Sequence, residues 1–325
     1  MSQVGFKVLF SDFEYDSLEI EENLIREQIP DIEFVYAQCR TEEEVIEVAK
    51  DVDAIINQYA PLGKKVIESL KDCKVIARYG IGFNTIDVQA ATEKNIKVCN
   101  VTDYCLDEVS DHAMALLLSL ARKVTFLNNK VKDGVWDYKV GTPIFKLRGS
   151  VLGLLGLGNI AQKVAKRAQA FGLKVIAYDP FIPREVAKEL NVELVEFKEL
   201  FRLSDYISVH TPLNETTIGI VGEEQFKWMK KEAFIINTSR GPIIDEKALI
   251  HALVNNEIAG AGLDVLEMEP IKEDNPLLKM EQVVLNPHVA WHSAESENEL
   301  KRKTAQNVAD VLQDKEPKYV VRVKN

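Results

Sequence analysis

The chain has 325 residues, of which 46% are hydrophobic and 28% are charged. A chain of this length exceeds what one hydrophobic core organises, and the composition is that of a globular protein, so we expect two folded domains. The formal net charge of −11 argues against direct binding of nucleic acid, which requires a basic surface.

Cysteine usage and the N-terminus indicate the compartment. The four cysteines form no C-x-x-C pair and are too few for a disulfide framework: Cys39, Cys73, Cys99 and Cys105. The N-terminus lacks the basic and apolar regions of a signal peptide. The longest apolar stretch, 113–121, is far shorter than the roughly 20 residues of a membrane helix. We expect a cytoplasmic protein that binds neither a membrane nor a metal ion.

From Lys7 onward, short β-rich runs alternate with helical patterns. The runs are KVLFSDF, EFVYAQ, DAIINQY, VIARYG and KVCNV, and the expected helices cover 17–28, 41–50, 64–70 and 87–94. Strands that alternate with helices predict a parallel sheet covered on both faces. Residues 1–103 therefore form a first, doubly wound α/β domain.

A second alternation follows a predicted long helix over 106–132 and a loose segment rich in glycine and proline. Its apolar runs are VLGLLG, KVIAYD, ELVEF, DYISVH, AFIINTS, AGAGLDV and VVLNPHV. This pattern predicts a second doubly wound sheet, of the dinucleotide-binding Rossmann type, over 104–293. A last helix over 294–312 and a short YVVRV strand are expected to return to the first domain, which then also includes 294–325.

A glycine motif lies directly after the first run of the second alternation. It contains Gly156, Gly158, Asn159 and Ile160 and opens a predicted helix. Glycines at such a turn let a pyrophosphate approach the backbone, and the helix N-terminus supplies free N–H groups and a positive dipole end. A motif of this kind can also simply close a strand–helix turn.

Asp179 makes the dinucleotide interpretation stronger. It ends the next predicted strand, at roughly the 20-residue offset of an acid that binds the 2′-hydroxyl of a ribose. A carboxylate repels a 2′-phosphate, so we expect NAD, while the nearby Arg184 keeps NADP as an alternative. Asp179 could instead cap the helix that follows Pro180.

Polar residues also follow the later strands of this domain, at the edge where a doubly wound sheet binds its ligands. Thr211 and Asp264 could hydrogen-bond the nicotinamide half of the cofactor, or could cap a helix or turn. The residues expected at the cofactor from these strand ends are His210, Thr211, Pro212, Thr238, Ser239 and Asp264.

Three further residues beyond predicted strand ends suit the reduction of a 2-oxo acid by nicotinamide. The reaction needs a cation for the carboxylate, which the planar fork of Arg240 offers. It also needs a proton donor, for which His288 is suited, with Glu269 holding its orientation. Taken singly, each has a structural alternative: a surface arginine, a turn residue before proline and a core histidine.

The chain contains only five histidines, and His292 competes with His288 because it lies one helical turn away. His112 is expected within a helix, and His251 is expected to face solvent.

Several segments resemble the D-isomer-specific 2-hydroxyacid dehydrogenases, a family that includes phosphoglycerate dehydrogenase, glyoxylate/hydroxypyruvate reductase and the C-terminal binding protein corepressors. They are VLGLLGLGNIA, HTPLNETTIGIVGEEQF, NTSRGPIIDEKAL, AGLDVLEMEP and NPHVAWHS. The resemblance implies NAD-dependent hydride transfer on a small D-2-hydroxy or 2-oxo acid. It also implies that the catalytic residues are Arg240, Glu269 and His288.

The resemblance further implies a flavodoxin-like substrate domain, a Rossmann NAD domain, a cleft between them and a homodimer formed through the long helix. Backbone N–H groups of the 57–60 loop, with Tyr59, and of Ile81 and Gly82 would face the substrate carboxylate. Tyr104 and Trp291 would be pocket walls, or else residues that pack between the domains.

The segments PHVAWHS and DYCLDEVSDHAMALLL are closest in kind to the corepressor-like branch. An NAD(H)-sensing interaction protein with little or no turnover is therefore the alternative function. Glu269 argues against formate dehydrogenases, which have glutamine there, and the end at Asn325 would leave out the C-terminal regulatory domain of some phosphoglycerate dehydrogenases.

Overall fold

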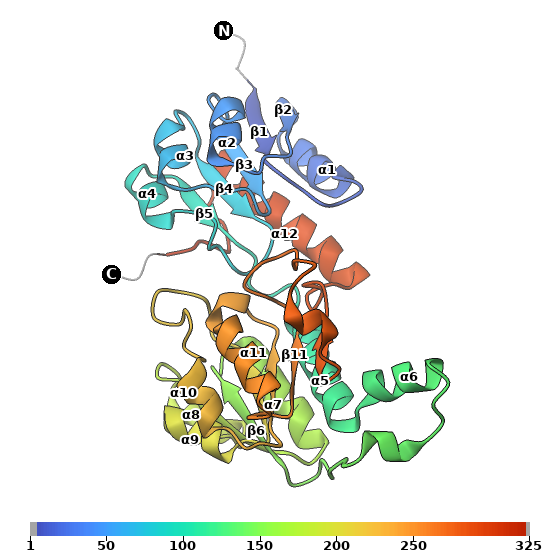
Figure 1. The fold of residues 1–325 in the computed structure, drawn as a ribbon. Helices are drawn as coiled ribbons and strands as arrows, with labels where there is room; N and C mark the ends of the chain where they lie inside the picture. The colour runs from blue at the N-terminus through green and yellow to red at the C-terminus, as the bar shows by residue number, and fades with distance from the viewer. Residues whose placement is uncertain (1–4, 323–325) are drawn as a thin grey trace. The chain divides into compact units, whose positions relative to one another are not determined.

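The computed structural model describes residues 5–322, and the chain divides into two compact units (Figure 1). Unit 1 comprises Met1–Cys105 and Ser293–Asn325, and unit 2 comprises Leu106–His292. Of the predicted first domain, residues 1–4 and 323–325 lie outside the described part of the chain.

Unit 1 contains a five-stranded sheet in the order β2-β1-β3-β4-β5, with every neighbouring pair parallel. This is the flavodoxin-like order of a doubly wound sheet, which confirms the predicted fold class. The strands are β1 Phe6–Phe10, β2 Ile32–Tyr36, β3 Ala54–Asn57, β4 Val75–Arg78 and β5 Lys97–Cys99.

A helix of unit 1 follows each of β1 to β4, as the alternation predicts. The helices are α1 Glu19–Gln28, α2 Glu42–Val48, α3 Lys64–Ser69, α4 Val88–Glu93 and the returning α12 Ala294–Leu312. Thr41 and Glu44 form a capping box that fixes the start of α2, and Asp87 caps α4. Helix α12 packs against α1 and against β3, β4 and β5.

Unit 2 contains a seven-stranded parallel sheet in the order β12-β11-β10-β9-β6-β7-β8. The order reverses between β6 and β9, the switch point at which a Rossmann sheet binds its dinucleotide. The strands are β6 Val151–Leu155, β7 Lys174–Tyr178, β8 Glu193–Leu194, β9 Tyr206–Val209, β10 Phe234–Asn237, β11 Gly260–Leu263 and β12 Val283–Leu285.

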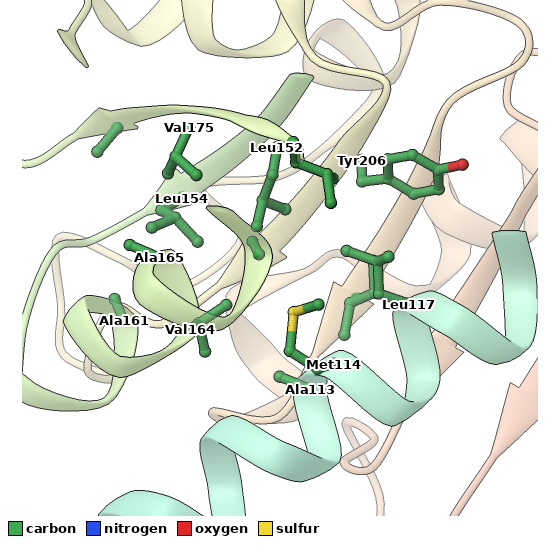
Figure 2. Packing of buried hydrophobic residues seen from close by; sticks show 14 of the residues in the cluster. Ala113, Met114, Leu117, Leu152, Leu154, Ala161, Val164, Ala165, Val175 and Tyr206 are labelled. Atoms are coloured by element: carbon green, nitrogen blue, oxygen red, sulfur yellow. The ribbon is translucent and has the colours of Figure 1, made fainter. Parts of the chain in front are cut away.

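The helices of unit 2, apart from α6, pack around this sheet. The helices of this unit are α5 Leu106–Arg122, α6 Val124–Lys132, α7 Asn159–Ala170, α8 Arg184–Glu189, α9 Phe197–Leu203, α10 Glu223–Trp228 and α11 Glu246–Val254, with short 3₁₀ helices η1 Tyr138–Gly141, η2 Gly241–Ile243 and η3 Pro276–Lys279. Figure 2 shows part of one core cluster, in which Met114 and Leu117 of α5 lie with Val164 of α7 and Leu152 of β6.

The predicted continuous helix over 106–132 is wrong, because the chain breaks it at Lys123, whose φ is 51°. The apolar face of α5 ends at the buried Leu120 and Ala121, whereas α6 has no buried residue. Without a core to follow, the chain turns and α6 projects from the rest of unit 2 (Figure 1). We call α6 and the segment after it, residues 124–150, the arm.

Of the predicted YVVRV strand, Val323 lies outside the described residues, and residues 319–322 return to the unit 1 sheet through an isolated bridge, not a regular strand. Val320 pairs with Cys99 in an antiparallel bridge, and the N–H of Val321 donates to Val98 O at 2.8 Å. Within residues 5–322, no helix combines the length and apolarity needed to cross a bilayer.

Candidate active site

The glycine motif forms the turn between β6 and α7. Gly156 has a φ of 92°, a conformation that favours glycine, and its N–H donates to Tyr178 O at 2.9 Å. Gly158 is the N-cap of α7, and the space where its side chain would be is open to 4 Å. Asn159 and Ile160 form the first turn of α7. The free N–H groups of this turn therefore have room for an anion.

Asp179 directly follows β7, beside the glycine turn. One carboxylate oxygen accepts the N–H of Leu157 at 2.8 Å, and the other accepts those of Phe181 at 2.9 Å and Ile182 at 3.2 Å. The N-cap of α8 is Pro183, so Asp179 forms a turn of its own and does not cap that helix. Arg184 is exposed at the start of α8.

His210, Thr211 and Pro212 follow β9. Burial lowers the pKa of His210 to about 4, so its ring is neutral at physiological pH, and Ser208 Oγ lies 2.8 Å from its Nε2. The carbonyl of Thr211 accepts the hydroxyl of Ser239 at 2.6 Å. This bond ties the end of β9 to the end of β10.

The loop after β10 contains Thr238, Ser239 and Arg240. The buried side chain of Asn237 shapes it: its Oδ1 accepts the N–H of Ser239 and its Nδ2 donates to Arg240 O, both at 2.9 Å. The Oγ1 of Thr238 is buried and has no hydrogen-bond partner among residues 5–322. An unsatisfied buried hydroxyl beside a predicted cofactor site is suited to a ligand contact.

Arg240 is half-buried, and its Nη1 donates to Ser239 O at 2.7 Å. The next residue must be glycine, because a Cβ on Gly241 would lie 1.9 Å from the backbone C and O of Leu266. This close approach brings the Arg240 loop against the loop that contains Glu269.

Glu269 and His288 form a hydrogen-bonded pair. Glu269 Oε2 lies 2.7 Å from His288 Nδ1, and Oε1 accepts the N–H of Leu266 at 2.9 Å. Burial tends to raise the pKa of Glu269, but the hydrogen bond and charge of His288, with the Leu266 N–H and Arg240, hold it below its ordinary value. The carboxylate is thus ionised at neutral pH and fixes the imidazole.

The backbone of His288 has a φ of 53°, which is uncommon outside glycine and recurs at functional sites. The buried Asp264 holds it there: its two oxygens accept the N–H groups of Val289 and Ala290 at 2.9 Å each, and its carbonyl accepts that of His288 at 2.8 Å. Asp264 therefore caps the His288 turn, the alternative left open for it.

The competing histidine is placed differently. His292 is exposed, and its ring contacts that of Trp291 at a centroid distance of 5.2 Å. His112, on α5, lies 3.3 Å from Asn286 Oδ1 and 3.6 Å from Asp264 Oδ1 through its Nε2. His251 is exposed on α11.

In unit 1, the loop of residues 57–60 is fixed by a residue that sequence reasoning missed. The fully buried Asp12 accepts the N–H of Gln58 at 3.0 Å, that of Tyr59 at 2.5 Å and Asn57 Nδ2 at 3.2 Å. The expectation that the loop's N–H groups face a substrate is therefore wrong for Gln58 and Tyr59. The side chain of Tyr59 is 37% exposed.

The other expected substrate residues of unit 1 follow β4 and β5. Ile81 and Gly82 are half-buried in the loop after β4, and Tyr104 is buried at the end of the unit's first segment. Burial raises the pKa of Tyr104 well above its ordinary value, so its hydroxyl stays protonated.

Asp12 and Asn237 carry no motif in the sequence, and the only signal for either is a polar residue at the end of a buried strand. Around β6, by contrast, the open space at Gly158, the Asp179 carboxylate and the unsatisfied Thr238 hydroxyl fit a dinucleotide. Within the described chain, no group of His, Cys, Asp or Glu residues could hold a metal ion.

Comparison with known proteins agrees with this geometry. Residues 114–290 match the model of the D-isomer specific 2-hydroxyacid dehydrogenase, NAD binding domain. The chain is 41% identical to D-3-phosphoglycerate dehydrogenase of Methanocaldococcus jannaschii over 312 residues, which is 95% of this chain and 59% of that protein. It is 40% identical to glyoxylate reductase of Korarchaeum cryptofilum over 81% of each chain.

Among solved structures, a glyoxylate reductase from Paecilomyes thermophila is similar at a TM-score of 0.88 and 29% identity, covering 98% of both chains. Unit 2 is accordingly an NAD-binding domain. The chain belongs to the D-isomer specific 2-hydroxyacid dehydrogenase family.

Proposed function

We propose that the protein is an NAD-dependent oxidoreductase that transfers a hydride between nicotinamide and a small D-2-hydroxy or 2-oxo acid. The observation that carries this proposal is the Glu269–His288 pair beside the Arg240 loop. A carboxylate-oriented imidazole next to a half-buried guanidinium is what the reduction of an anionic carbonyl substrate requires.

In this proposal, bound NADH supplies the hydride, and the chain's residues handle the charge and the proton. Arg240 binds the carboxylate or carbonyl oxygen of the acid. Glu269 engages His288 at Nδ1, which leaves Nε2 to donate a proton to the carbonyl oxygen as it becomes an alkoxide. In the reverse direction, neutral His288 takes the proton from the hydroxyl group.

The cofactor contacts are assigned on the same basis. The first turn of α7 binds the pyrophosphate, Asp179 accepts hydrogen bonds from the adenosine ribose, and the neutral His210 with Thr211, Pro212, Thr238 and Ser239 lines the rest of the site. Asp264 acts mainly by holding the His288 turn. Unit 1 would be the substrate domain, contributing Ile81, Gly82 and the side chain of Tyr59, and Trp291 would contact the substrate from unit 2.

A homodimer formed through α5 and the arm is part of the proposal. The arm exposes Trp136 at 89%, Tyr138 at 77% and Phe145 at 55%. Unit 2 also has a hollow of about 1010 Å³ that residues of the arm help to line, with apolar residues such as Phe145, Phe234 and Met280 beside polar ones. The exposed aromatic side chains of the arm and this hollow are surfaces that a second copy of the chain could cover in a two-fold dimer.

The cysteines support a reducing compartment such as the cytoplasm. All four are buried thiols that are not part of a disulfide in the described part of the chain, and burial raises the pKa of Cys73 and of Cys99 to about 12. Such thiols are unreactive and form no disulfide.

Absorbance of NADH tests the proposed activity. The panel comprises glyoxylate, hydroxypyruvate, pyruvate, phenylpyruvate and 3-phosphohydroxypyruvate, with NADPH as the cofactor control. We expect oxidation of NADH with at least one acid. NADH binding without turnover of any of them would overturn the proposal and favour an NAD(H)-sensing interaction protein.

A further inference from the structure

Two consecutive carbonyl groups in the loop after β4 are hydrogen-bonded to the segment after β5. The N–H of Val101 donates to Gly80 O at 3.0 Å, and Asn100 Nδ2 donates to Ile81 O at 2.7 Å. Both donors belong to unit 1, and Asn100 is 6% exposed.

These two bonds determine where the next two N–H groups point. The cis peptide bonds within residues 5–322 are at Pro143 and Pro270, so the peptides that join Gly80, Ile81 and Gly82 are trans. In a trans peptide the N–H points away from its own carbonyl. The N–H groups of Ile81 and Gly82 therefore both point away from the Asn100 segment.

Neither of these N–H groups has an acceptor in the described part of the chain. Two successive N–H groups that point to one side form a concavity that binds anions. Glycine at position 80 allows this loop conformation, since the φ of 117° at Gly80 is one that residues with a side chain rarely adopt. In the neighbouring loop, Asp12 already occupies the N–H groups of Gln58 and Tyr59.

The backbone of Asn100 is itself hydrogen-bonded through both its N–H and its carbonyl. Its N–H donates to Tyr319 O at 3.2 Å, and its carbonyl accepts Asn307 Nδ2 of α12 at 3.2 Å. The side-chain amide that holds Ile81 is therefore attached to a rigid support made by β5, α12 and the C-terminal segment.

We propose that Asn100 is a positioning residue for substrate binding: by holding Ile81 O it orients the N–H of Gly82 beside that of Ile81, so that the two together bind the carboxylate of a 2-oxo acid. The proposal rests on the proposed function for the nature of the substrate. The new element is the buried side-chain amide of Asn100, which fixes one of the two peptides, while the N–H of Val101 fixes the other.

Oxalate is a suitable probe because its binding requires no turnover. We expect Asn100→Ala to weaken the oxalate Kd, measured by calorimetry with NADH-saturated enzyme, about tenfold to hundredfold, the range for hydrogen bonds to a charged group. The Kd of NADH alone should not change. The matched control is Gln313→Ala, which removes another side-chain amide of unit 1 that donates to a backbone carbonyl, that of Gln28, and contacts neither Asn100 nor Ile81.

If Asn100→Ala does not fold, Asn100→Ser is measured instead, because the serine hydroxyl is too short to reach Ile81 O. A second readout compares kcat/KM for glyoxylate with that for its uncharged ethyl ester, and only the acid should lose activity. Equal oxalate affinity in Asn100 variants and wild type, or no oxalate binding by wild type, would overturn the inference. If oxalate binding depends on Asn100 but none of the acids is turned over, the proposed function is wrong and the inference about Asn100 stands.

Discussion

His288 Nδ1 and Glu269 Oε2 lie 2.7 Å apart, in the two loops that follow the neighbouring strands β12 and β11. The pair depends on the cap that Asp264 places on the His288 turn and on the N–H of Leu266, which holds the second oxygen of Glu269. Because the pKa of Glu269 is held below its ordinary value, a full negative charge faces the imidazole at neutral pH.

Glu269→Gln should move the pH profile of the reaction. The variant keeps the shape of the side chain but removes the charge that stabilises protonated His288. In the reduction direction, kcat/KM should therefore begin to fall at a pH lower by about one unit or more. Glu267→Gln is the control, since that carboxylate accepts the N–H of Glu246 and leaves the imidazole alone. Superimposable profiles for Glu269→Gln and wild type would contradict the pairing.

Arg240→Ala should lower kcat/KM for the 2-oxo acid by roughly 100-fold, because charge-assisted hydrogen bonds contribute about 1.5–3 kcal/mol. The Kd of NADH should stay within about twofold of wild type. Arg240→Lys keeps the charge but loses the planar fork, so its loss should be intermediate. Steady-state kinetics with NADH titrations separate these effects, and unchanged kcat/KM in Arg240→Ala would remove the residue from the mechanism.

Asp179→Ala should reduce the preference for NAD. The substitution removes the acceptor for the ribose hydroxyls and the charge that repels a 2′-phosphate, and it also releases the N–H of Leu157. We expect the ratio of kcat/KM for NADH to that for NADPH to fall about tenfold or more. The assignment is wrong if this ratio does not change.

His210 should make the fold sensitive to acid. Its pKa is about 4 in the folded chain and about 6.5 in an unfolded one, so between these values the unfolded state binds more protons. Stability is therefore lost as pH falls from about 6.5 to about 4, by roughly 3 kcal/mol at most.

Urea denaturation of the protein without cofactor at several pH values measures this loss. His210→Gln should lose less stability than wild type across the window, whereas the control His251→Gln, at an exposed position, should behave as wild type. Equal acid sensitivity in His210→Gln would show that other groups cause the effect.

The sequence predicted the two parallel sheets because their alternating pattern is local and strong. The glycine turn with Asp179, and the loops of Arg240, Glu269 and His288, were also found, because polar residues at carboxyl ends of parallel strands meet at one edge. The break at Lys123 could not be found, since it depends on where the apolar face of α5 runs out against the body of unit 2.

The supporting residues were missed for a different reason. Asp12, Asn100 and Asn237 act through backbone groups of loops, and the first two bind segments 46 and 19 residues away in sequence. Nothing in residue type or spacing shows which carbonyl or N–H such a side chain will meet. The same holds for the cap that Asp264 places on the His288 turn, because its sequence position does not show which N–H groups its carboxylate accepts.

The most direct test of the mechanism compares His288→Asn with His292→Asn in the reduction of the best 2-oxo acid by NADH. Asparagine tolerates the φ of 53° at position 288 but cannot act as a general acid. We predict a loss of about 10²- to 10⁴-fold in kcat for His288→Asn, with near wild-type turnover for His292→Asn. An inactive His292→Asn beside an active His288→Asn would contradict the account and assign the proton transfer to the other histidine.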